Sequence, residues 1–360
     1  MIFDLQDDIV DLIGNLPVEV FDPRYGSIYL PPFLRGAFSW IMSGFSFTIT
    51  HHYFVSFLRS SRPKVVLTVI DNNRNLYSAR AATAETDTRF VIFQNGNRWL
   101  SEFPAEASLK PDDIFFCLTQ AYLKPLRNTA VGAASVIPSG TLASKLHKVD
   151  ASDSNNHTTA GYISSWRQGK MLNGELWHKD NLGTPIPHYS FYRPEHELLA
   201  LLMTSLNRQG MKLEIIGSSS EFQSEELSFY QSILGHEGWT FSPRIADERS
   251  YRKLFYYPIL FCVDSTLGYE ALSLLKKVMF LDNSSAAHCR IPFAYPSDAS
   301  DSSQFVLKAD SEIDWASQIS WMSAINQESF CALAASVVGE TSIQTGHLDL
   351  LKILDTAINE

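Results

Sequence analysis

The sequence predicts an α/β protein of two domains, each built on a parallel β-sheet, with a cleft between them. Three observations lead to this prediction. Short apolar segments alternate with helical segments, as in parallel sheets that are covered on both faces. A polar segment, residues 149–160, interrupts this alternation. The length of 360 residues also exceeds that of a typical single domain.

The first predicted domain covers residues 1–148. Its expected strands share β-branched or aromatic residues and end in small polar groups; they are VVLTVI (65–70), FVIF (90–93), DDIFFCLT (112–119) and AASVIPSG (133–140). NLYSARAATAE, residues 75–85, is the expected helix between the first two strands. The apolar run GAFSWIMSGFSFTIT, residues 36–50, is too short to span a bilayer, so a buried helix packed on a sheet is favoured over a membrane-contacting one.

The second predicted domain covers residues 161–340, and residues 341–360 are expected to form a separate amphipathic helix. The expected strands are GYISSW (161–166), MKLEII (211–216), WTFSP (239–243), ILFCVD (259–264) and KVMFLD (277–282). The expected helices are 194–210, 224–235, 248–257 and 268–275. Pro194 favours the first turn of its helix and Gly210 favours the end.

Charge and cysteine usage exclude several classes of protein. A net charge of −10 argues against sequence-independent binding of nucleic acid. The four cysteines have no metal-ligand spacing, which predicts reduced thiols in a cytoplasmic protein. The acidic N-terminus MIFDLQDDIVDL is unlike an export signal. We expect neither a metal site nor a bound cofactor.

Polar residues follow several expected strands, where ligands of such sheets bind. These residues are Asp71 and Asn72; Gln94, Asn95 and Gly96; Ser164, Ser165 and Arg167; Gly217, Ser218, Ser219 and Ser220; and Asp264, Ser265 and Thr266. Arg193 could also reach a phosphate. Turns favour such residues in any case, but five clusters together predict a ligand-lined cleft.

The stretch VDSTLGYEAL, residues 263–272, has two interpretations. Ser265 or Thr266 could cap the helix, with Glu270 completing a capping box. Alternatively, the helix start binds a phosphate, Gly268 lets the ligand approach the backbone, and Glu270 accepts hydrogen bonds from a ribose. Neither GxGxxG nor GxxxxGK[ST] occurs, which disfavours dinucleotide or P-loop binding.

The chain resembles bacterial glycosyltransferases of surface-polysaccharide biosynthesis, with the two Rossmann-like domains of the GT-B type. The resemblance rests on PKVVLTVIDNNRNLYSA, FVIFQNGNRW, GYISSWR and SYRKLFYYPILFCVDSTLGYEALSLLKKVMFL, which together span roughly residues 60–285. Similar O-antigen and capsule proteins have a glycine before the paired lysines, where this chain has Ser273-Leu274-Leu275 before Lys276-Lys277. Some such enzymes are Kdo transferases, which implies CMP-Kdo as the leading donor.

The resemblance implies transfer of a sugar from a nucleotide-sugar donor to a lipid-linked or oligosaccharide acceptor. It also implies a location in the cytoplasm, and it leaves open whether the protein contacts the inner membrane peripherally. Ser265, Thr266 and Glu270 would bind the donor, and Asp71, Asn72 and Gln94 would face the acceptor or the transferred sugar. The nucleotide is also assigned to Gly217, Ser218 and Gly268, and the substrate to Asn95, Ser164, Arg167 and Arg193. Asp71 is the first candidate for a general base or nucleophile, Glu195 is the second, and capping of the next helix is the alternative role of Asp71. A nucleotide-sugar epimerase and a non-catalytic carbohydrate-binding scaffold are the rival functions.

Overall fold

The computed structural model describes residues 2–3, 20–21, 28–96, 98, 102–104, 108–141, 158–179, 184–245, 251–263, 265–282, 302–308 and 314–338. The chain divides into two compact units. Unit 1 comprises residues 1–146 and 344–360, and unit 2 comprises residues 147–343. The expected C-terminal helix, residues 341–360, and most of the expected linker lie outside the described residues.

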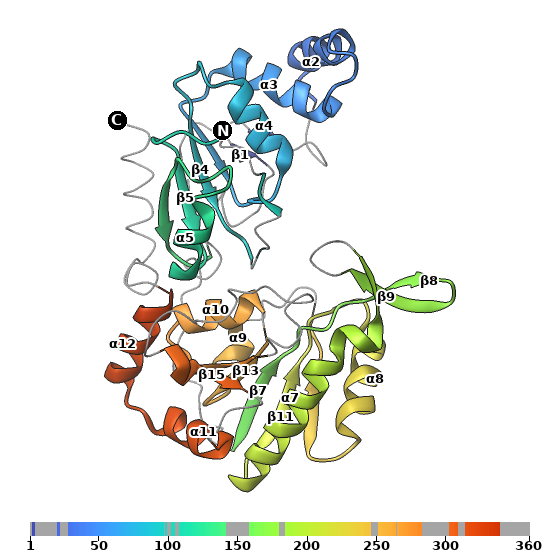
Figure 1. The fold of residues 1–360 in the computed structure, drawn as a ribbon, viewed down its shortest axis with the longest axis vertical. Helices are drawn as coiled ribbons and strands as arrows, with labels where there is room; N and C mark the ends of the chain where they lie inside the picture. The colour runs from blue at the N-terminus through green and yellow to red at the C-terminus, as the bar shows by residue number, and fades with distance from the viewer. Residues whose placement is uncertain are drawn as a thin grey trace. The chain divides into compact units, whose positions relative to one another are not determined.

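Unit 1 contains a six-stranded sheet in the order β2-β1-β3-β4-β5-β6 (Figure 1). All its pairings are parallel, as the sequence predicts. The strands are β1 (Ile2–Phe3), β2 (Val20–Phe21), β3 (Val65–Thr68), β4 (Arg89–Phe93), β5 (Ile114–Cys117) and β6 (Ser135–Pro138). The central strands β3, β4 and β5 are almost entirely buried, because both faces of the sheet are covered.

The described helices of unit 1 are α2 (Leu30–Met42), α3 (Ile49–Ser61), α4 (Arg74–Ala82), the 3₁₀ turn η2 (Gln120–Tyr122) and α5 (Leu123–Leu126). The apolar run 36–50 is not the single buried helix expected from the sequence. It covers the end of α2, a turn and the start of α3, and much of its apolar surface is exposed. Within the described part of the chain, no helix combines the length and apolarity that crossing a membrane requires.

Unit 2 contains a second parallel sheet, in the order β12-β11-β7-β13-β14-β15. Its strands are β7 (Thr159–Ile163), β11 (Lys212–Ile216), β12 (Trp239–Ser242), β13 (Leu260–Cys262), β14 (Val278–Asp282) and β15 (Val306–Lys308). The chain builds outward from β7 to β12 and then crosses to β13 on the other side of β7. This is the doubly wound Rossmann order, whose direction reverses between β7 and β13.

The described helices of unit 2 are α7 (His188–Arg208), α8 (Gln223–Leu234), α9 (Tyr251–Leu254), α10 (Thr266–Ser273), the 3₁₀ turn η5 (Ser302–Phe305), α11 (Trp315–Ala324) and α12 (Gln327–Val338). The expected helix start at Pro194 is wrong. The helix begins six residues earlier, and Pro194 lies inside α7, where it cannot donate a backbone hydrogen bond.

A small antiparallel sheet, β10-β9-β8, precedes α7 and has no counterpart in the sequence-based expectation. Its strands are β8 (Lys170–Leu172), β9 (Glu175–Lys179) and β10 (Pro185–Pro187). Asn173 and Gly174 connect β8 to β9, both with positive φ (53° and 83°). This pair suits the tight turn of a two-residue hairpin.

Candidate functional site at the carboxyl ends of the strands

The reversal of strand order in unit 2 marks where its ligand site is expected. In doubly wound sheets, ligands bind outside the carboxyl ends of the two strands that flank this reversal. Here those strands are β7 and β13. Ser164, Ser165 and Arg167 follow β7, and Ser265 and Thr266 follow β13, so the fold brings two of the predicted polar clusters to this position. Asp264 lies outside the described residues.

Helix α10 begins immediately after β13, and the geometry of its first turn excludes a capping box. Ser265 is the N-cap residue, but its side chain makes no capping hydrogen bond. Glu270 is the fifth helical residue, whereas a capping box uses the third. Glu270, which is 7% exposed, is therefore not part of a capping box.

Gly268 has a packing role in the structure rather than the open approach expected from the sequence. A Cβ atom at this position would lie 2.3 Å from the sulfur of Cys262 and 3.5 Å from the ring of Phe280. Both neighbours are fully buried in strands of the sheet. The glycine thus lets α10 lie directly on β13 and β14, which holds the helix start at the carboxyl end of β13.

The loop after β11 is organised around a buried carboxylate of unit 2. Glu226, in the first turn of α8 and fully buried, accepts hydrogen bonds from the backbone N–H groups of Ser218 (2.9 Å) and Ser219 (3.1 Å) and from the Ser218 hydroxyl (3.0 Å). A Cβ atom on Gly217 would lie 3.0 Å from the ring of Phe241 and 3.3 Å from Glu226. The donors that the sequence assigns to a phosphate are thus already paired with an internal anion.

Glu226 also contacts the segment after β7. The Ser164 hydroxyl lies 2.5 Å from the Glu226 carboxylate and 2.8 Å from the Tyr230 hydroxyl. The backbone N–H group of Trp166 donates to the Ser164 hydroxyl (3.1 Å). Ser164 is 4% exposed. Its polar atoms therefore join β7 to α8, and the prediction that Ser164 contacts a substrate stays a prediction.

Glu195 is the buried carboxylate that α7 places beside β7. It is fully buried and accepts hydrogen bonds from the hydroxyls of Tyr162 (2.5 Å) and Ser165 (2.7 Å). Ser165 directly follows the carboxyl end of β7, so Glu195 reaches the same edge of the sheet as α10. A carboxylate at this edge could act as a base only after exchanging one of these hydroxyl partners.

The two predicted arginines of unit 2 differ in how they are held. The backbone of Arg167 donates to the Tyr192 hydroxyl (2.7 Å), while its side chain is exposed. Arg193 lies on α7 with its side chain 67% exposed, and it pairs with Glu197 one turn later at 3.5 Å. Arg167 therefore follows the switch-point strand, whereas Arg193 occupies a solvated surface of the helix.

In unit 1, Asp71 lies beyond the carboxyl end of β3 as one half of a buried ion pair. Its carboxylate is fully buried and accepts hydrogen bonds from Arg98, Nε to Oδ2 at 3.2 Å and Nη2 to Oδ1 at 3.2 Å. Asn95 N–H also donates to it at 3.4 Å. Burial raises the pKa of Asp71, and the Arg98 charge opposes this rise. Helix α4 is capped by Asn73, which excludes the alternative capping role of Asp71.

The neighbouring loop residues hold this pair in place. Gln94 is fully buried, accepts from the Leu118 N–H group (2.9 Å) and donates to the Gly96 carbonyl (2.8 Å), which ties the end of β4 to the end of β5. Asn95 also accepts a short hydrogen bond from Arg98. Asn72 is exposed beside Asp71. Asn72 and Asn95 are thus accessible, whereas the Gln94 side chain is used within the fold.

Three residues at these edges were missed by sequence reasoning. Arg98 was missed because nothing in its own segment indicates a partner 27 residues earlier. Thr119, after β5, and Trp166, after β7, are buried, and among the described residues the Thr119 hydroxyl and the Trp166 Nε1 have no hydrogen-bond partner. Because buried donors are normally paired, these two are candidate ligand contacts.

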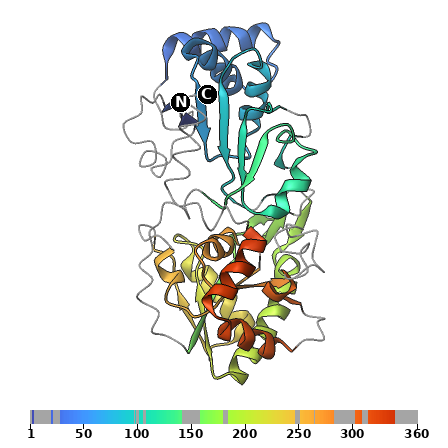
Figure 2. The ribbon, with the colours of Figure 1, turned by 90° about the vertical axis from the view of Figure 1, so that its left-hand side faces the viewer.

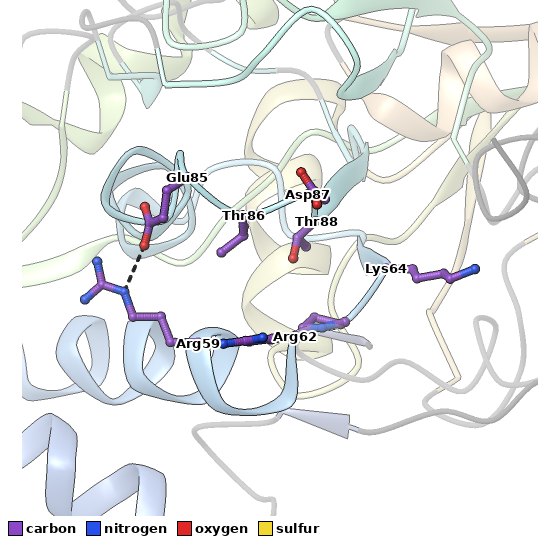
Figure 3. Close-up of a pocket in the computed structure, with 8 residues that line it drawn as sticks. Arg59, Arg62, Lys64, Glu85, Thr86, Asp87 and Thr88 are labelled. Carbon is purple, nitrogen blue, oxygen red and sulfur yellow. Dashed lines mark hydrogen bonds and ion pairs between the residues drawn. The ribbon is translucent and has the colours of Figure 1, made fainter.

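A surface pocket of about 530 Å³ lies at the opposite edge of the unit 1 sheet (Figure 3). It is lined by Arg59, Arg62, Pro63, Lys64, Glu85, Thr86, Asp87 and Thr88. Lys64 precedes β3 and Thr88 precedes β4, so the pocket adjoins the amino ends of these strands. Arg59 and Glu85 already form an ion pair there at 3.1 Å. This position is unlike the ligand site of a doubly wound sheet.

Solved structures with the same two-domain architecture cover nearly the whole chain. One is described as a "putative UDP-N-acetylglucosamine 2-epimerase" from Listeria monocytogenes; it has a TM-score of 0.55 and 14% identity over 99% of this chain and 86% of that one. A glycosyltransferase from Rickettsia africae has a TM-score of 0.52 and 10% identity over 95% and 86%. The UDP-GlcNAc 2-epimerase of Neisseria meningitidis, solved with UDP-GlcNAc, has 0.50 and 12% over 99% and 98%.

These likenesses establish the fold: two Rossmann-like domains, as in GT-B glycosyltransferases and the related epimerases. No curated protein matches the chain by sequence. A family of sequences described as "putative O-antigen biosynthesis protein" matches residues 115–338, which is more than half of the chain. The protein therefore belongs to this O-antigen biosynthesis family.

Proposed function

We propose that the protein is a glycosyltransferase that moves a sugar from a nucleotide-sugar donor to a carbohydrate acceptor during synthesis of a surface polysaccharide. The observation that carries the proposal is membership of the O-antigen biosynthesis family on a fold shared with a known glycosyltransferase. Building such a polysaccharide consists of forming glycosidic bonds, and a nucleotide sugar supplies the activated sugar for that reaction.

The donor nucleotide is assigned to unit 2, at the start of α10. Free N–H groups and the dipole of a helix start attract phosphate, and α10 follows one of the two strands at the switch point. Glu270 would accept hydrogen bonds from the ribose. Ser265, Thr266 and Trp166 border the same edge of the sheet, and the Trp166 Nε1, which has no partner among the described residues, offers a donor to the nucleotide or sugar.

The acceptor is assigned to unit 1, where Asp71 lies at the carboxyl end of β3. In the described segments just beyond the carboxyl ends of β3, β4, β5 and β6, Asp71 is the one acidic residue. Its pKa, raised by burial, brings it closer to the range in which a carboxylate accepts a proton from an attacking hydroxyl. Arg98 would keep it ionised between turnovers. Asn72 and Asn95, both exposed, would contact sugar hydroxyls.

A nucleotide-sugar 2-epimerase is the second candidate, because two of the similar structures carry that description. An epimerase must remove and return a proton within one sugar, which requires acid and base groups around that sugar. Asp71 in unit 1 and Glu195 in unit 2 are the two carboxylates proposed for catalysis, and each is already held by partners in its own unit. Transfer needs a single base and is therefore favoured.

Incubation of the full chain with nucleotide sugars tests the proposal. The panel contains CMP-Kdo, which the sequence resemblance suggests, together with UDP-, GDP- and CDP-linked sugars. Each donor is offered with and without an oligosaccharide acceptor, and the products are separated by mass spectrometry and NMR. Acceptor-dependent release of the nucleotide with a glycosylated product supports a transferase. Isomerisation without an acceptor supports the epimerase, and binding without turnover across the panel supports a non-catalytic scaffold.

A further inference from the structure

The outer surface of α2 is an exposed apolar face. Its large apolar side chains recur at helical spacing and continue into the flanking segments: Ile28 (64% exposed), Leu30 (61%), Leu34 (57%), Phe38 (66%), Ile41 (56%), Met42 (69%), Phe45 (60%) and Phe47 (66%). We call these eight residues the α2 face. Single exposed apolar residues are common, but a contiguous stripe of this kind indicates an interaction surface.

The orientation of the α2 face is set by close packing on its other side. Gly36 is buried against α3, and a Cβ atom there would lie 2.6 Å from the Cα of Tyr53. Because the two helices approach so closely, the face of α2 that contains Gly36 and Pro32 packs against α3. In Figures 1 and 2, α2 is the outermost helix of unit 1, with α3 between it and the sheet. The opposite stripe of α2 must therefore point outward.

The segment that contains α2 and α3 is cationic in a chain with a net charge of −10. Residues 28–64 contain Arg35, Arg59, Arg62 and Lys64 and no Asp or Glu. Arg35 lies next to Leu34 on α2 itself and is exposed. Among the residues that line the neighbouring pocket, the acidic ones are Glu85, which pairs with Arg59, and Asp87 (Figure 3). The segment that contains α2 and α3 thus carries four cations and no carboxylate of its own.

We propose that the α2 face docks unit 1 on an anionic lipid bilayer, with α2 lying in the plane of the interface. Apolar side chains would enter the boundary between head groups and acyl chains, while the cations contact anionic head groups. The 13 residues of α2 are too few to span a bilayer, which requires about 20. Gly44, Phe45 and Phe47 have positive φ in the turn after α2, where both aromatic rings are exposed beyond the helix end.

The cations favour a bilayer over a second copy of the chain. A symmetric dimer through the α2 face would place the same surface of each copy against the other. Arg35 of each copy would then meet a surface whose own segment, residues 28–64, supplies cations and no carboxylate to pair with it. An anionic membrane instead supplies the opposite charge and the apolar phase together.

Vesicle sedimentation of the full chain tests the proposal. The vesicles contain either equal parts of phosphatidylcholine and phosphatidylglycerol or phosphatidylcholine alone. We expect sedimentation with the anionic vesicles, weakening as salt is raised, and little with the neutral ones. The double variant Leu34→Ser/Phe38→Ser should weaken partitioning by about tenfold for each apolar side chain withdrawn from the bilayer. The variant Arg35→Gln should weaken it by about fivefold.

A matched control removes exposed apolar side chains from unit 2. Met171 (66% exposed) and Leu172 (44%) lie on β8, and Met171→Ser/Leu172→Ser should partition like the unchanged protein. Circular dichroism and melting confirm that each variant is folded. The proposal is overturned if the unchanged chain ignores anionic vesicles, or if Leu34→Ser/Phe38→Ser binds them equally well. It is also overturned if that variant only converts a dimer to a monomer in ultracentrifugation, or if it lowers the melting temperature, since a partner copy or the chain itself would then cover the face.

Discussion

Removal of Arg98 should expose how strongly unit 1 depends on the buried ion pair. Asp71 is fully buried, and the Arg98 side chain is 19% exposed, with two of its nitrogens bonded to the carboxylate. Removing one partner of a buried pair typically costs about 3–5 kcal/mol, because a buried charge is left uncompensated. The partial exposure of Arg98 places Arg98→Ala near the lower limit, about 3 kcal/mol. For a domain of this size that corresponds to a decrease in Tm of roughly 6–12 °C.

The double variant separates the ion pair from simple packing. In Asp71→Asn/Arg98→Ala no buried charge remains, so it should be more stable than Arg98→Ala alone. Asp71→Asn by itself keeps the shape of the side chain and one acceptor oxygen, and should cost about 1–2 kcal/mol through the weakened hydrogen bonds. Urea unfolding of all four proteins measures the coupling. A double variant that is less stable than Arg98→Ala would refute the ion-pair reasoning.

The pH dependence of stability provides an independent check on Asp71. Burial raises its pKa in the folded protein above the unfolded value of 3.8. Between the two values the folded chain holds a proton that the unfolded chain releases. This contribution to stability is therefore present below the unfolded pKa and is lost as the pH rises through the folded pKa. The stability of Asp71→Asn relative to the unchanged protein should accordingly improve as the pH rises above 4. Parallel pH profiles of the two proteins would contradict this assignment.

The same variant decides the catalytic role. If Asp71 is the base of the proposed transfer, Asp71→Asn should lower turnover by about a hundredfold or more, since general-base catalysis typically contributes 10²–10⁴-fold. Donor affinity should change little, because the donor is assigned to unit 2. An Asp71→Asn protein that retains most of its activity directs the search to Glu195.

Four further outcomes are expected. Glu226→Gln should destabilise unit 2 by about 2–4 kcal/mol in urea unfolding, because its amide group would face the N–H donors of the loop after β11; an unchanged midpoint would show that the loop does not depend on the carboxylate. Gly268→Ala should lower the melting temperature, since its methyl group would collide with Cys262, and a melting temperature equal to that of the unchanged protein would refute the packing role. Glu270→Ala should weaken nucleotide binding by about 1–3 kcal/mol in calorimetry, whereas the exposed Glu197→Ala should not; equal affinities would remove Glu270 from the site. Turnover should survive a chelator, and loss of activity that magnesium or manganese restores would show a metal requirement.

The strands could be predicted because a doubly covered parallel sheet imposes a local pattern. The predicted strands 65–70 and 211–216 are short, mostly apolar and followed by small polar residues, and the structure confirms them as β3 (65–68) and β11 (212–216). Helix boundaries depend less on local pattern. Proline at 194 suits the first turn of a helix, yet α7 begins at His188, because the aromatic residues before the proline pack into the core of unit 2 and extend the helix backwards.

The fate of the apolar run 36–50 could not be predicted from its composition. Apolarity alone favours burial, but a helix on the outside of another helix can bury only one stripe. Gly36 lies on the stripe that contacts α3, and the sequence of α2 alone does not indicate which stripe this is. The partners of polar residues were equally hidden, since Asp71 follows β3 and Arg98 follows β4, and the two are 27 residues apart in the sequence.

The two loops of unit 2 that the sequence assigned to the nucleotide differ in one physical respect. After β11, the N–H groups of Ser218 and Ser219 are held by Glu226, so an external phosphate would have to displace a buried carboxylate of the protein itself. After β13, the side chain of the N-cap residue Ser265 makes no capping hydrogen bond, and Gly268 allows α10 to pack closely on the sheet at the switch point. An anionic ligand gains little where the N–H donors are already paired with a carboxylate of the protein. The loop after β11 is thus better suited to shape the site than to hold the phosphate, which we place at the start of α10 because that helix follows a strand of the switch point.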